Sequence, residues 1–539
     1  MMRTSLIFLS MLTLFSIDLF QLSAQNQYSD FKTMSHRLEV LGRDYHSICT
    51  SKSLIKTAGG KDIWVLTIGT DEKDNKPGVA VLGGIEGNHL LGKELAFGFA
   101  ELILKNASSP EIKELLDKIT FYVFPDVSPD ATEQFFSDLK YERVINSRST
   151  DNDRDFVYGE DPYEDLNKDG CITLIRVDDP SGEYIESAED NRIMIKADLS
   201  KGQSGHYLIF SEGIDNDKDG SFNEDGAGGV SFNRNFTFNY EEFGLNAGLH
   251  SVSEPETKAI ADFLFDRFNI YAVFTFGPQD NLGQSLKHSD NTTGDRRITS
   301  IMKTDEVINK LVSDKYHEIT GVKGSPAVKT TSGNFMDWAY FHYGRYSFST
   351  PAWWFPVEEG KNPEVAFMKL NEKKNINNNF VKWTGINHPD FPGKKTEVGG
   401  IKPFSLINPP SDTLGDLIYK NYKFITAIAS MHPELEFLDI KTDNSGGNIF
   451  RVSLKLHNKG IFSSCAEIGE KNIWTRVMRI TLEPADGQTF LSGQRVQRVE
   501  RLEGDESVEF NWLIKGKGSI KLSAGALNTG IITKTIELK

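Results

Sequence analysis

The stretch Val79-Ala80-Val81-Leu82-Gly83-Gly84-Ile85-Glu86-Gly87-Asn88-His89 decides the fold. Its apolar run is short, bounded by glycine and typical of a buried strand, and a glycine-rich turn follows it. Residues Glu94 to Leu104 then have the composition and spacing of a helix. In α/β folds ligands bind at strand ends of this kind, so Glu86 and His89 are the first candidate functional residues.

The same alternation continues on both sides of this stretch. Further buried strands are predicted at 63–68, 119–124, 270–276 and 346–350. A strong helix is predicted from Glu256 to Phe268, with Ser253 as its N-cap at capping-box spacing from Glu256. Strands alternating with helices over roughly 400 residues predict an α/β domain with a mixed, largely parallel sheet and flanking helices.

From about Pro433 the pattern changes to strict alternation with a period of two. Residues 451–457 and 507–513 show it clearly, and glycine-containing turns separate the runs. This pattern predicts a small all-β sandwich domain at 433–539. No chemistry-bearing motif falls in it, so an accessory or stabilising role is the interpretation.

The first residues predict export. Arg3 precedes an apolar run from Leu6 to Phe20, and Leu22-Ser23-Ala24 offers a small-residue cleavage site. Residues 1–24 are therefore predicted to be a secretory signal peptide, and the protein to be secreted or periplasmic. An uncleaved N-terminal anchor is the alternative. No later stretch reaches the length of a membrane-spanning helix.

The amino-acid composition and net charge restrict the kinds of binding partner. With 38% hydrophobic residues the chain has ample material for globular cores. Its net charge of -16 argues against nucleic acid and anionic membrane surfaces as partners. The acidic residues are concentrated between Asp151 and Asp225, which suggests cation binding.

Five motifs follow one another in a fixed order between the predicted strands and helices. They are 83–89, Ser128-Pro129-Asp130-Ala131, 229–236 with Asn233 and Arg234, 253–257, and 337–340 leading to 346–350. This ordered series resembles the zinc carboxypeptidase family, the carboxypeptidase A/B-like metallopeptidases, from about Tyr28 to about Ser430. The resemblance implies a carboxypeptidase-like domain at 25–432, with the acidic segment 146–229 as an insertion.

In that family a His-x-x-Glu pair and a later His bind one zinc ion, and a Glu acts as general base on the metal-bound water. An Asn-Arg pair holds the terminal carboxylate of the substrate. Here the metal pair is reversed, as Glu86 and His89. The third ligand position falls on Gly277 and the general-base position on Pro351, whereas the Asn-Arg pair is retained as Asn233 and Arg234.

These departures weaken the case for catalysis. Second-shell changes alone cost about 10–100-fold in metal affinity, and loss of a general base costs about 10²–10⁴ in rate. The leading hypothesis is a pseudoenzyme without catalytic residues that binds a peptide or another carboxylate ligand through Asn233 and Arg234. The alternative is an active zinc metallocarboxypeptidase or related hydrolase, with Glu86 and His89 as zinc ligands.

Several alternative interpretations of the candidate site residues remain. In an active enzyme Asp280, His288, Glu358 or Glu359 would have to supply the missing groups. Glu86 and His89 could instead simply hydrogen-bond across the turn. Arg234 could be a structural ion-pair partner.

The acidic insertion contains two similar loops. Oxygen-bearing residues at positions 1, 3 and 5 with glycine at position 6 are typical of the start of an EF-hand calcium loop. One loop offers Asp165, Asn167 and Asp169, and the other offers Asp215, Asp217 and Asp219. Position 12 is Arg176 or Gly226, so Glu224 or Asp179 would have to replace the usual glutamate. Calcium binding is predicted, with a solvated acidic turn as the alternative; a calcium-stabilised structural surface protein is accordingly a third functional hypothesis.

Overall fold

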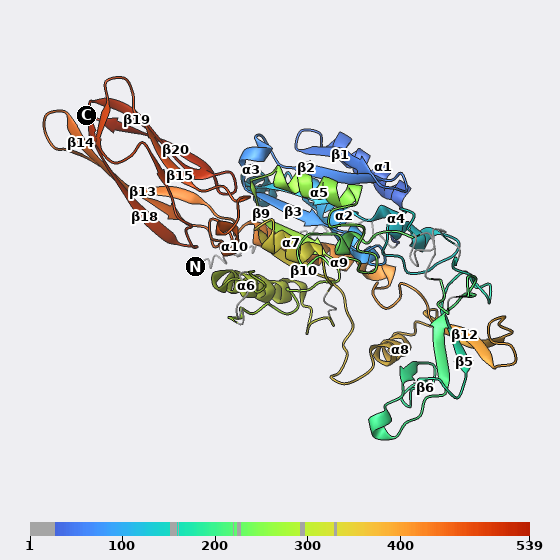
Figure 1. The fold of residues 1–539 in the computed structure, drawn as a ribbon. Helices are drawn as coiled ribbons and strands as arrows, with labels where there is room; N and C mark the ends of the chain where they lie inside the picture. The colour runs from blue at the N-terminus through green and yellow to red at the C-terminus, as the bar shows by residue number, and fades with distance from the viewer. Residues whose placement is uncertain are drawn as a thin grey trace, which may run out of the picture.

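The computed structural model describes residues 27–150, 159, 161–218, 220–223, 228–290, 297–327 and 331–539. The predicted signal peptide lies outside the described residues. No helix in the described ranges is long and apolar enough to cross a membrane. Figure 1 shows a main body, an elongated β domain at the C-terminal end and a smaller lobe beyond the other side of the main body.

The main body is built on a six-stranded sheet in the order β1-β2-β4-β3-β9-β10. Strands β4, β3, β9 and β10 run parallel, and β1 and β2 are antiparallel to their neighbours. The mixed, largely parallel sheet predicted from the sequence is therefore confirmed. Its strands are β1 (Cys49–Lys56), β2 (Asp62–Ile68), β3 (Gly78–Leu82), β4 (Thr120–Phe124), β9 (Ile270–Phe276) and β10 (Tyr346–Thr350).

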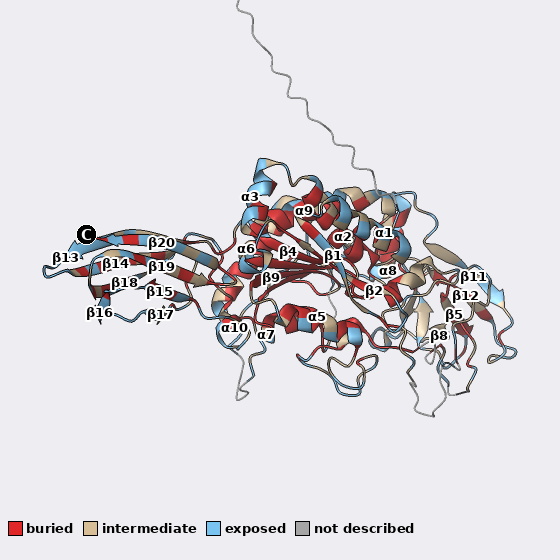
Figure 2. Ribbon diagram, turned by 90° about the horizontal axis from the view of Figure 1, so that it is seen from above, coloured by how far each residue is buried: buried red, intermediate tan, exposed pale blue. Residues whose placement is uncertain are grey.

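Helices cover both faces of this sheet (Figure 2). Alternate residues of β3 show the two layers, since Val79 and Val81 join one apolar core while Ala80 and Leu82 join the other. Burial on both faces explains why the strands are uninterrupted apolar runs. The first core includes α1 (Phe31–Asp44), α2 (Leu90–Lys105), α3 (Pro110–Lys118), α6 (Lys303–Thr320) and α9 (Leu414–Ala429); the second includes α5 (Pro255–Phe265) and α7 (Phe335–Phe341).

The predicted N-cap of α5 is wrong. The helix begins at Pro255, and its N-cap residue is Glu254. The Ser253 hydroxyl is instead used elsewhere, because it donates to Glu254 at 2.8 Å and accepts from the side-chain amide of Asn235 at 3.0 Å. Proline at the first helical position still starts the helix, since its fixed φ suits that position.

The acidic insertion does not build its lobe alone. It supplies β5 (Leu174–Asp178), β6 (Tyr184–Glu186), β7 (Met194–Lys196) and β8 (Tyr207–Ser211) to a six-stranded sheet. The other two strands, β11 (Phe380–Ile386) and β12 (Thr396–Ile401), come from a distant segment, and β12 pairs antiparallel with β5. Helix α8 (Pro363–Lys373) lies beside this sheet in Figure 1. We call this unit the inserted lobe.

The C-terminal domain is a sandwich of two four-stranded sheets, as predicted. A separate apolar core lies between them. One sheet has the order β13-β14-β18-β16 and the other β17-β15-β19-β20. The strands are β13 (Leu435–Asn444), β14 (Ile449–Asn458), β15 (Arg479–Glu483), β16 (Thr489–Ser492), β17 (Val496–Arg498), β18 (Glu506–Lys515), β19 (Gly518–Ala526) and β20 (Gly530–Leu538).

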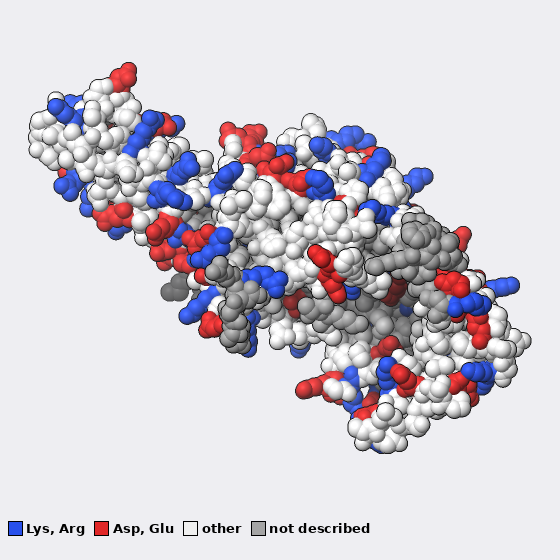
Figure 3. All heavy atoms as spheres, viewed as in Figure 1, with Lys and Arg blue, Asp and Glu red and all other residues white. Residues whose placement is uncertain are grey.

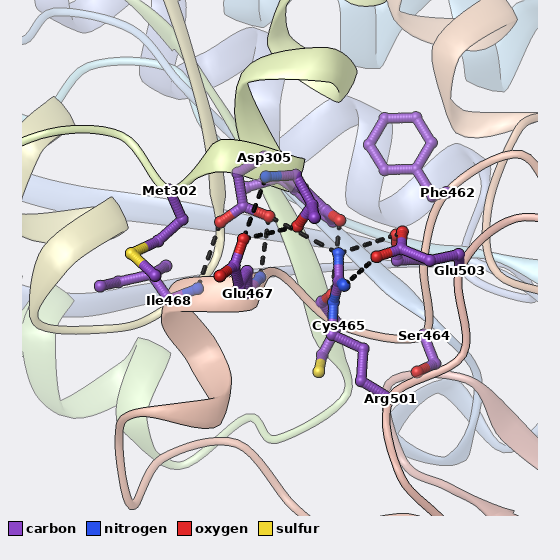
Figure 4. A network of polar contacts seen from close by, with 12 residues as sticks. Met302, Asp305, Phe462, Ser464, Cys465, Glu467, Ile468, Arg501 and Glu503 are labelled. Carbon is purple, nitrogen blue, oxygen red and sulfur yellow. Dashed lines mark hydrogen bonds and ion pairs between the residues drawn. The ribbon is translucent and has the colours of Figure 1, made fainter. Parts of the chain in front are cut away.

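The sandwich is joined to the main body through the segment between β14 and β15. Phe462 and Ile468 from this segment belong to the same apolar core as α2 and α9. Asp305 of α6 lies beneath it and accepts hydrogen bonds from the backbone N–H groups of Glu467 and Ile468 at 2.8 and 3.2 Å (Figure 4). Apolar burial and buried polar bonds thus fix the sandwich to the main body.

The remaining elements are short. They are α4 (Pro129–Thr132), α10 (Glu467–Glu470), and the 3-10 turns η1 (Lys73–Asn75), η2 (Glu133–Phe136), η3 (Leu199–Lys201), η4 (Phe232–Arg234) and η5 (Ser411–Thr413). On the face shown in Figure 3 acidic and basic side chains are interspersed, so the net negative charge is not gathered into one patch there.

Candidate functional site

The glycine turn after β3 places Glu86 and His89 at the carboxyl end of the parallel strands. A Cβ on Gly83 would lie 2.3 Å from the backbone oxygen of Gly92 and 2.6 Å from that of Pro125. Only glycine allows the strand end and the start of α2 to approach so closely. His89 is the residue that precedes α2, and its side chain makes no capping bond.

The His89 imidazole is buried among backbone groups. Its Nε2 lies 3.1 Å from the carbonyl oxygen of Pro351, and only 4% of the residue is exposed. Burial lowers the pKa of His89 to about 4, so the ring is neutral at neutral pH. A neutral ring that donates from Nε2 leaves Nδ1 as a bare acceptor, and Nδ1 has no hydrogen-bond partner among the described residues.

Glu86 shares its environment with Asn233. One carboxylate oxygen, Oε1, accepts a hydrogen bond from the Asn233 side-chain amide at 2.9 Å. Burial raises the pKa of the Glu86 carboxyl, while the Asn233 bond and the positive charge of Arg234 oppose that rise. Glu86 therefore lies between a neutral donor and a nearby cation. Its side chain makes no hydrogen bond to His89, but the His89 backbone N–H donates to the Glu86 carbonyl at 3.0 Å across the turn.

Asn233 is fully buried and fully used. Its amide nitrogen donates to Glu86 and, at 2.9 Å, to the side-chain oxygen of Gln279, while its own oxygen accepts from the Phe335 backbone at 3.1 Å. Gln279 in turn donates to the Thr331 hydroxyl at 2.6 Å. Asn233 thus orients Glu86 and has no spare donor for a ligand.

Arg234 is placed differently from its neighbour. It is partly exposed, and its Nη1 donates to the Leu245 carbonyl at 3.1 Å. It forms no ion pair with any residue in the described ranges. The structural ion pair that was one reading of Arg234 is therefore not found among those residues, and a cation with free donors lies beside Glu86.

Two segments of the chain are similar to known families of domains. Residues 34–195 match the zinc carboxypeptidase family, and residues 434–537 match a domain of unknown function (DUF8731). Carboxypeptidase M of Mus musculus is 25% identical over 111 residues, which cover 20% of this chain and 25% of that protein. Human carboxypeptidase D is 26% identical over 137 residues, which cover 24% of this chain and 10% of that protein.

These similarities support the predicted resemblance of the main body to the zinc carboxypeptidase family. The chain spans a quarter or less of the length of these two relatives. The crystal structure of thrombin activatable fibrinolysis inhibitor is similar with a TM-score of 0.43 and 14% identity, over 75% of this chain and 74% of that one.

The residues present do not fit the zinc ion of the carboxypeptidase family. At Gly277 a Cβ would lie 3.1 Å from the Cβ of Ile85, so the position of the third ligand has no side chain and little room for one. The carbonyl oxygen of Pro351, the residue at which the resemblance predicts the general base, lies 3.1 Å from His89 Nε2. In the described part of the chain no group of three or more His, Cys, Asp and Glu side chains could hold a metal ion.

The groups that could have moved into the carboxypeptidase site are used elsewhere. The Asp280 carboxylate accepts the backbone N–H groups of Gly283 and Gln284, both at 2.9 Å. His288 bonds the Ile301 carbonyl at 2.6 Å and Asp290 at 2.9 Å. Glu358 and Glu359 are exposed. None of the four has a hydrogen bond or ion pair to Glu86 or His89 among the described residues.

Gln279 and Thr331 are the residues that sequence reasoning missed. Gln279 lies two residues beyond Gly277 at the carboxyl end of β9, a position that invites attention in a parallel sheet. Thr331 has no comparable signal, because its contact depends on how a distant loop folds back.

The first predicted calcium loop closes on itself. The two Asp165 carboxylate oxygens accept the backbone N–H groups of Asp169 at 3.1 Å and Gly170 at 2.7 Å. Asn167 accepts the Asp169 N–H at 3.0 Å and donates to its carboxylate at 3.1 Å. Arg176, at position 12, forms ion pairs with Glu397 and Glu186. As a positively charged residue it cannot serve as a calcium ligand.

The second loop has the same internal bond. Asp215 accepts the backbone N–H groups of Lys218 at 2.7 Å and Gly220 at 3.2 Å. The Lys218 ammonium group pairs with Asp390 at 2.7 Å. Asp217 is described and has a partner, whereas Asp219 and Glu224 lie outside the described residues. Calcium in these loops stays a prediction.

Proposed function

We propose that this protein is an exported, non-catalytic member of the zinc carboxypeptidase family that binds a peptide or another carboxylate-bearing ligand. The observation that carries the proposal is a contrast between neighbouring residues of the candidate site. The ligand and base positions hold Gly277 and Pro351, while Arg234 keeps free donors beside the polar pair of Glu86 and Asn233.

Each residue has a distinct part in this proposal. Arg234 binds the carboxylate, since a guanidinium can donate two parallel hydrogen bonds to it. Asn233 is a positioning residue, because its side-chain amide donates hydrogen bonds to both Glu86 and Gln279. Glu86 would repel an incoming anion when charged. The raised pKa of its buried carboxyl favours the neutral form, which can instead donate a hydrogen bond.

Export to the periplasm or beyond the cell rests on the predicted signal peptide at residues 1–24. An exported carboxylate-binding protein would meet peptide ends released by other enzymes outside the cytoplasm. The sandwich, firmly attached to the main body, has a stabilising role in this proposal.

Titration with fluorescent peptides tests the proposal. A peptide with a free C-terminal carboxylate should bind, and its C-terminal amide should bind about 10–100-fold more weakly, as expected for loss of a charged hydrogen-bonding partner. Arg234→Ala should produce the same loss for the free acid, whereas Arg43→Ala, which removes an exposed arginine on α1, should not. Equal binding of acid and amide would refute carboxylate recognition.

A hydrolysis assay separates this proposal from its alternative. We expect no release of C-terminal residues, even with excess zinc. Turnover that requires zinc and disappears in His89→Ala would show an active hydrolase with a rearranged site. Such a result would overturn the proposed lack of catalysis without affecting the role of Arg234 in binding.

A further inference from the structure

A pocket of about 660 Å³ lies between helix α8 and the segment that joins β12 to α9. The turn between α8 and β11 continues one wall, and Tyr28 and Phe135 complete the other. Its volume falls within the range of roughly 300–1,000 Å³ that is usual for small-molecule sites. Since the walls come from segments far apart in the sequence, the pocket exists only in the folded protein.

Trp353 offers this pocket an aromatic ring and a hydrogen-bond donor. It lies just beyond β10, is partly exposed, and packs in part against the first apolar core. The indole N–H of its neighbour Trp354 donates to the Lys323 carbonyl at 3.1 Å, whereas that of Trp353 makes no hydrogen bond to the described residues. Such a ring suits a ligand that is apolar on one face and polar at its edge. The lining contains four further aromatic rings, those of Tyr28, Phe135, Phe367 and Phe404.

Side-chain amides supply much of the polar part of the lining. Asn371 of α8 is only 4% exposed, and its oxygen accepts from the side-chain amide of Asn379 at 3.4 Å. Its Nδ2 has no hydrogen-bond partner among the described residues. A buried donor without an acceptor destabilises the protein, and a ligand oxygen that accepts from it removes this destabilisation. An amide both donates and accepts, as does each hydroxyl of a sugar.

Asn408, in the opposite wall, has its hydrogen bonds within the protein and joins the pocket to the candidate site. Its amide nitrogen donates to the Asn88 carbonyl at 2.8 Å, and its oxygen accepts from the Leu91 backbone N–H at 3.1 Å. Asn88 belongs to the glycine turn after β3. The pocket is therefore built onto that turn, although neither Asn233 nor Arg234 lines it.

The lining has little charge. Lys374 and Asp412 are its two charged residues, both are exposed, and their charges are opposite. Recognition of a carboxylate or phosphate is favoured by charged donors such as paired guanidinium groups, which this lining does not contain. Aromatic rings, amides and the hydroxyls of the segment 405–413 are instead complementary to a neutral ligand that carries many hydroxyl groups.

We propose that this pocket binds a neutral oligosaccharide, with one sugar ring against the indole of Trp353 and its hydroxyls hydrogen-bonded to Asn371 and Asn379. A sugar ring combines an apolar face with a polar edge, and a peptide backbone has no such face. This second site goes beyond the proposed carboxylate binding and does not depend on it.

Titration with uncharged oligosaccharides tests the inference. The probes are maltotetraose, cellotetraose and the tetramer of N-acetylglucosamine, each added to the whole protein at up to about 10 mM, a range that detects millimolar affinity. Saturation-transfer difference NMR detects binding and isothermal titration calorimetry measures it. We expect at least one probe to bind.

Paired variants locate the site. Trp353→Ala should weaken binding about tenfold, whereas Trp354→Ala, which changes the adjacent indole outside the lining, should bind like the wild type. Asn379→Ala should weaken binding about fivefold, and Asn377→Ala, an exposed asparagine outside the lining, should not. Asn379 is partly exposed, so its variant should melt like the wild type and stays informative if Trp353→Ala is destabilised.

The other outcomes overturn the inference. Binding of none of the three probes contradicts an oligosaccharide site, and binding that neither Trp353→Ala nor Asn379→Ala weakens lies elsewhere on the protein. A C-terminally amidated peptide that binds and is weakened by Trp353→Ala, without binding of any probe, would show a peptide as the occupant. The carboxylate proposal is decided separately, because these probes carry no carboxylate.

Discussion

Two carboxylates, Asp305 at the junction with the sandwich and Glu86 at the carboxyl end of β3, both have a pKa that burial raises. Asp305 is buried and Glu86 is partly exposed, and their partners differ. The oxygens of Asp305 accept three hydrogen bonds, from two backbone N–H groups and the Tyr340 hydroxyl at 2.7 Å, and Arg501 lies 3.8 Å away (Figure 4). Glu86 accepts one, from Asn233.

This difference separates structural from functional polarity. A buried polar group with all its partners stabilises one arrangement of the chain and has no capacity for a ligand. A polar group that lacks hydrogen-bond partners destabilises the unliganded protein, and a ligand that supplies a partner removes this destabilisation. We infer that the junction stabilises the architecture, whereas the Glu86 carboxyl group has capacity for a further hydrogen-bond partner.

Removal of the Asp305 carboxylate should have the largest effect. Asp305→Ala leaves two buried N–H groups without acceptors and removes one of the two carboxylates near Arg501, the other being Glu503. We expect a loss of about 3–5 kcal/mol in the free energy of unfolding, the range for a broken buried pair. Urea unfolding followed by tryptophan fluorescence measures it.

Asp305→Asn is the matched control for shape. Asparagine retains one acceptor, but its NH₂ group must face a donor on the other side, so a smaller loss of about 2 kcal/mol is expected. A loss below about 1 kcal/mol in both variants would contradict the structural role of the junction.

The next largest effect is on the pH dependence of stability, through His89. His89 has a pKa of about 4 in the folded protein against 6.5 ordinarily, because burial disfavours its charged form. Its contribution to stability is present in full above pH 6.5 and is lost as the pH falls from 6.5 toward 4. The difference corresponds to up to about 3 kcal/mol.

His89→Gln should therefore flatten the dependence of stability on pH between pH 7.5 and 5. Urea midpoints at these two values measure the change. His36→Gln alters an exposed histidine on α1 and should keep the wild-type dependence. If His89→Gln retains the full acid sensitivity, the His89 ring is not the buried neutral group described above.

Glu86→Gln tests the second carboxylate of the comparison with Asp305. Glutamine can keep the one hydrogen bond from Asn233 through its side-chain oxygen. Because burial raises the pKa of Glu86 above its ordinary 4.5, its favourable contribution is present below pH 4.5 and is lost as the pH rises through the folded-state value. The variant should be as stable as the wild type or up to about 1 kcal/mol more stable at pH 7, in contrast to Asp305→Asn.

Urea unfolding at pH 7 and at pH 4 compares Glu86→Gln with the wild type. The advantage of the variant should shrink at pH 4, where both side chains are neutral. A loss of about 2 kcal/mol or more at pH 7 would mean that charged Glu86 is a structural residue like Asp305.

The sequence predicted the central sheet because its strands are buried on both faces, so apolar runs such as 79–82 and 270–276 stand out. It also predicted the sandwich, where strict alternation marks the buried face of β14. The inserted lobe escaped prediction, since β5 pairs with β12 far along the chain and only three-dimensional contact brings the two together. Local pattern cannot show such pairing.

The site was predicted in part for the same reason. Motif order located Glu86, His89, Asn233 and Arg234, and the structure brings Glu86, Asn233 and Arg234 together. Motif order could not show that the side-chain amide of Asn233 makes all its hydrogen bonds within the protein, whereas Arg234 keeps free donors. The division of roles within the Asn-Arg pair depends on distances, and residue types do not encode them.

The acidic loops lie between the two extremes of the comparison. Asp165 and Asp215 already accept the N–H groups of Gly170 and Gly220, so each loop keeps its shape through its own backbone. A calcium ion would add only its own binding free energy. With a dissociation constant of about 1 mM, typical of extracellular sites, 10 mM calcium would stabilise the fold by about 1.4 kcal/mol.

Thermal melting in 10 mM calcium and in EDTA measures this contribution. We expect a rise of about 1–3 °C with calcium and less with magnesium, which demands a tighter octahedral site. An Asp165→Asn, Asp215→Asn double variant keeps one acceptor in each loop and loses a charge, so the calcium increment should disappear while melting in EDTA changes little. Identical melting of the wild type in calcium and EDTA would show that internal hydrogen bonds alone satisfy these carboxylates, as they do at Asp305.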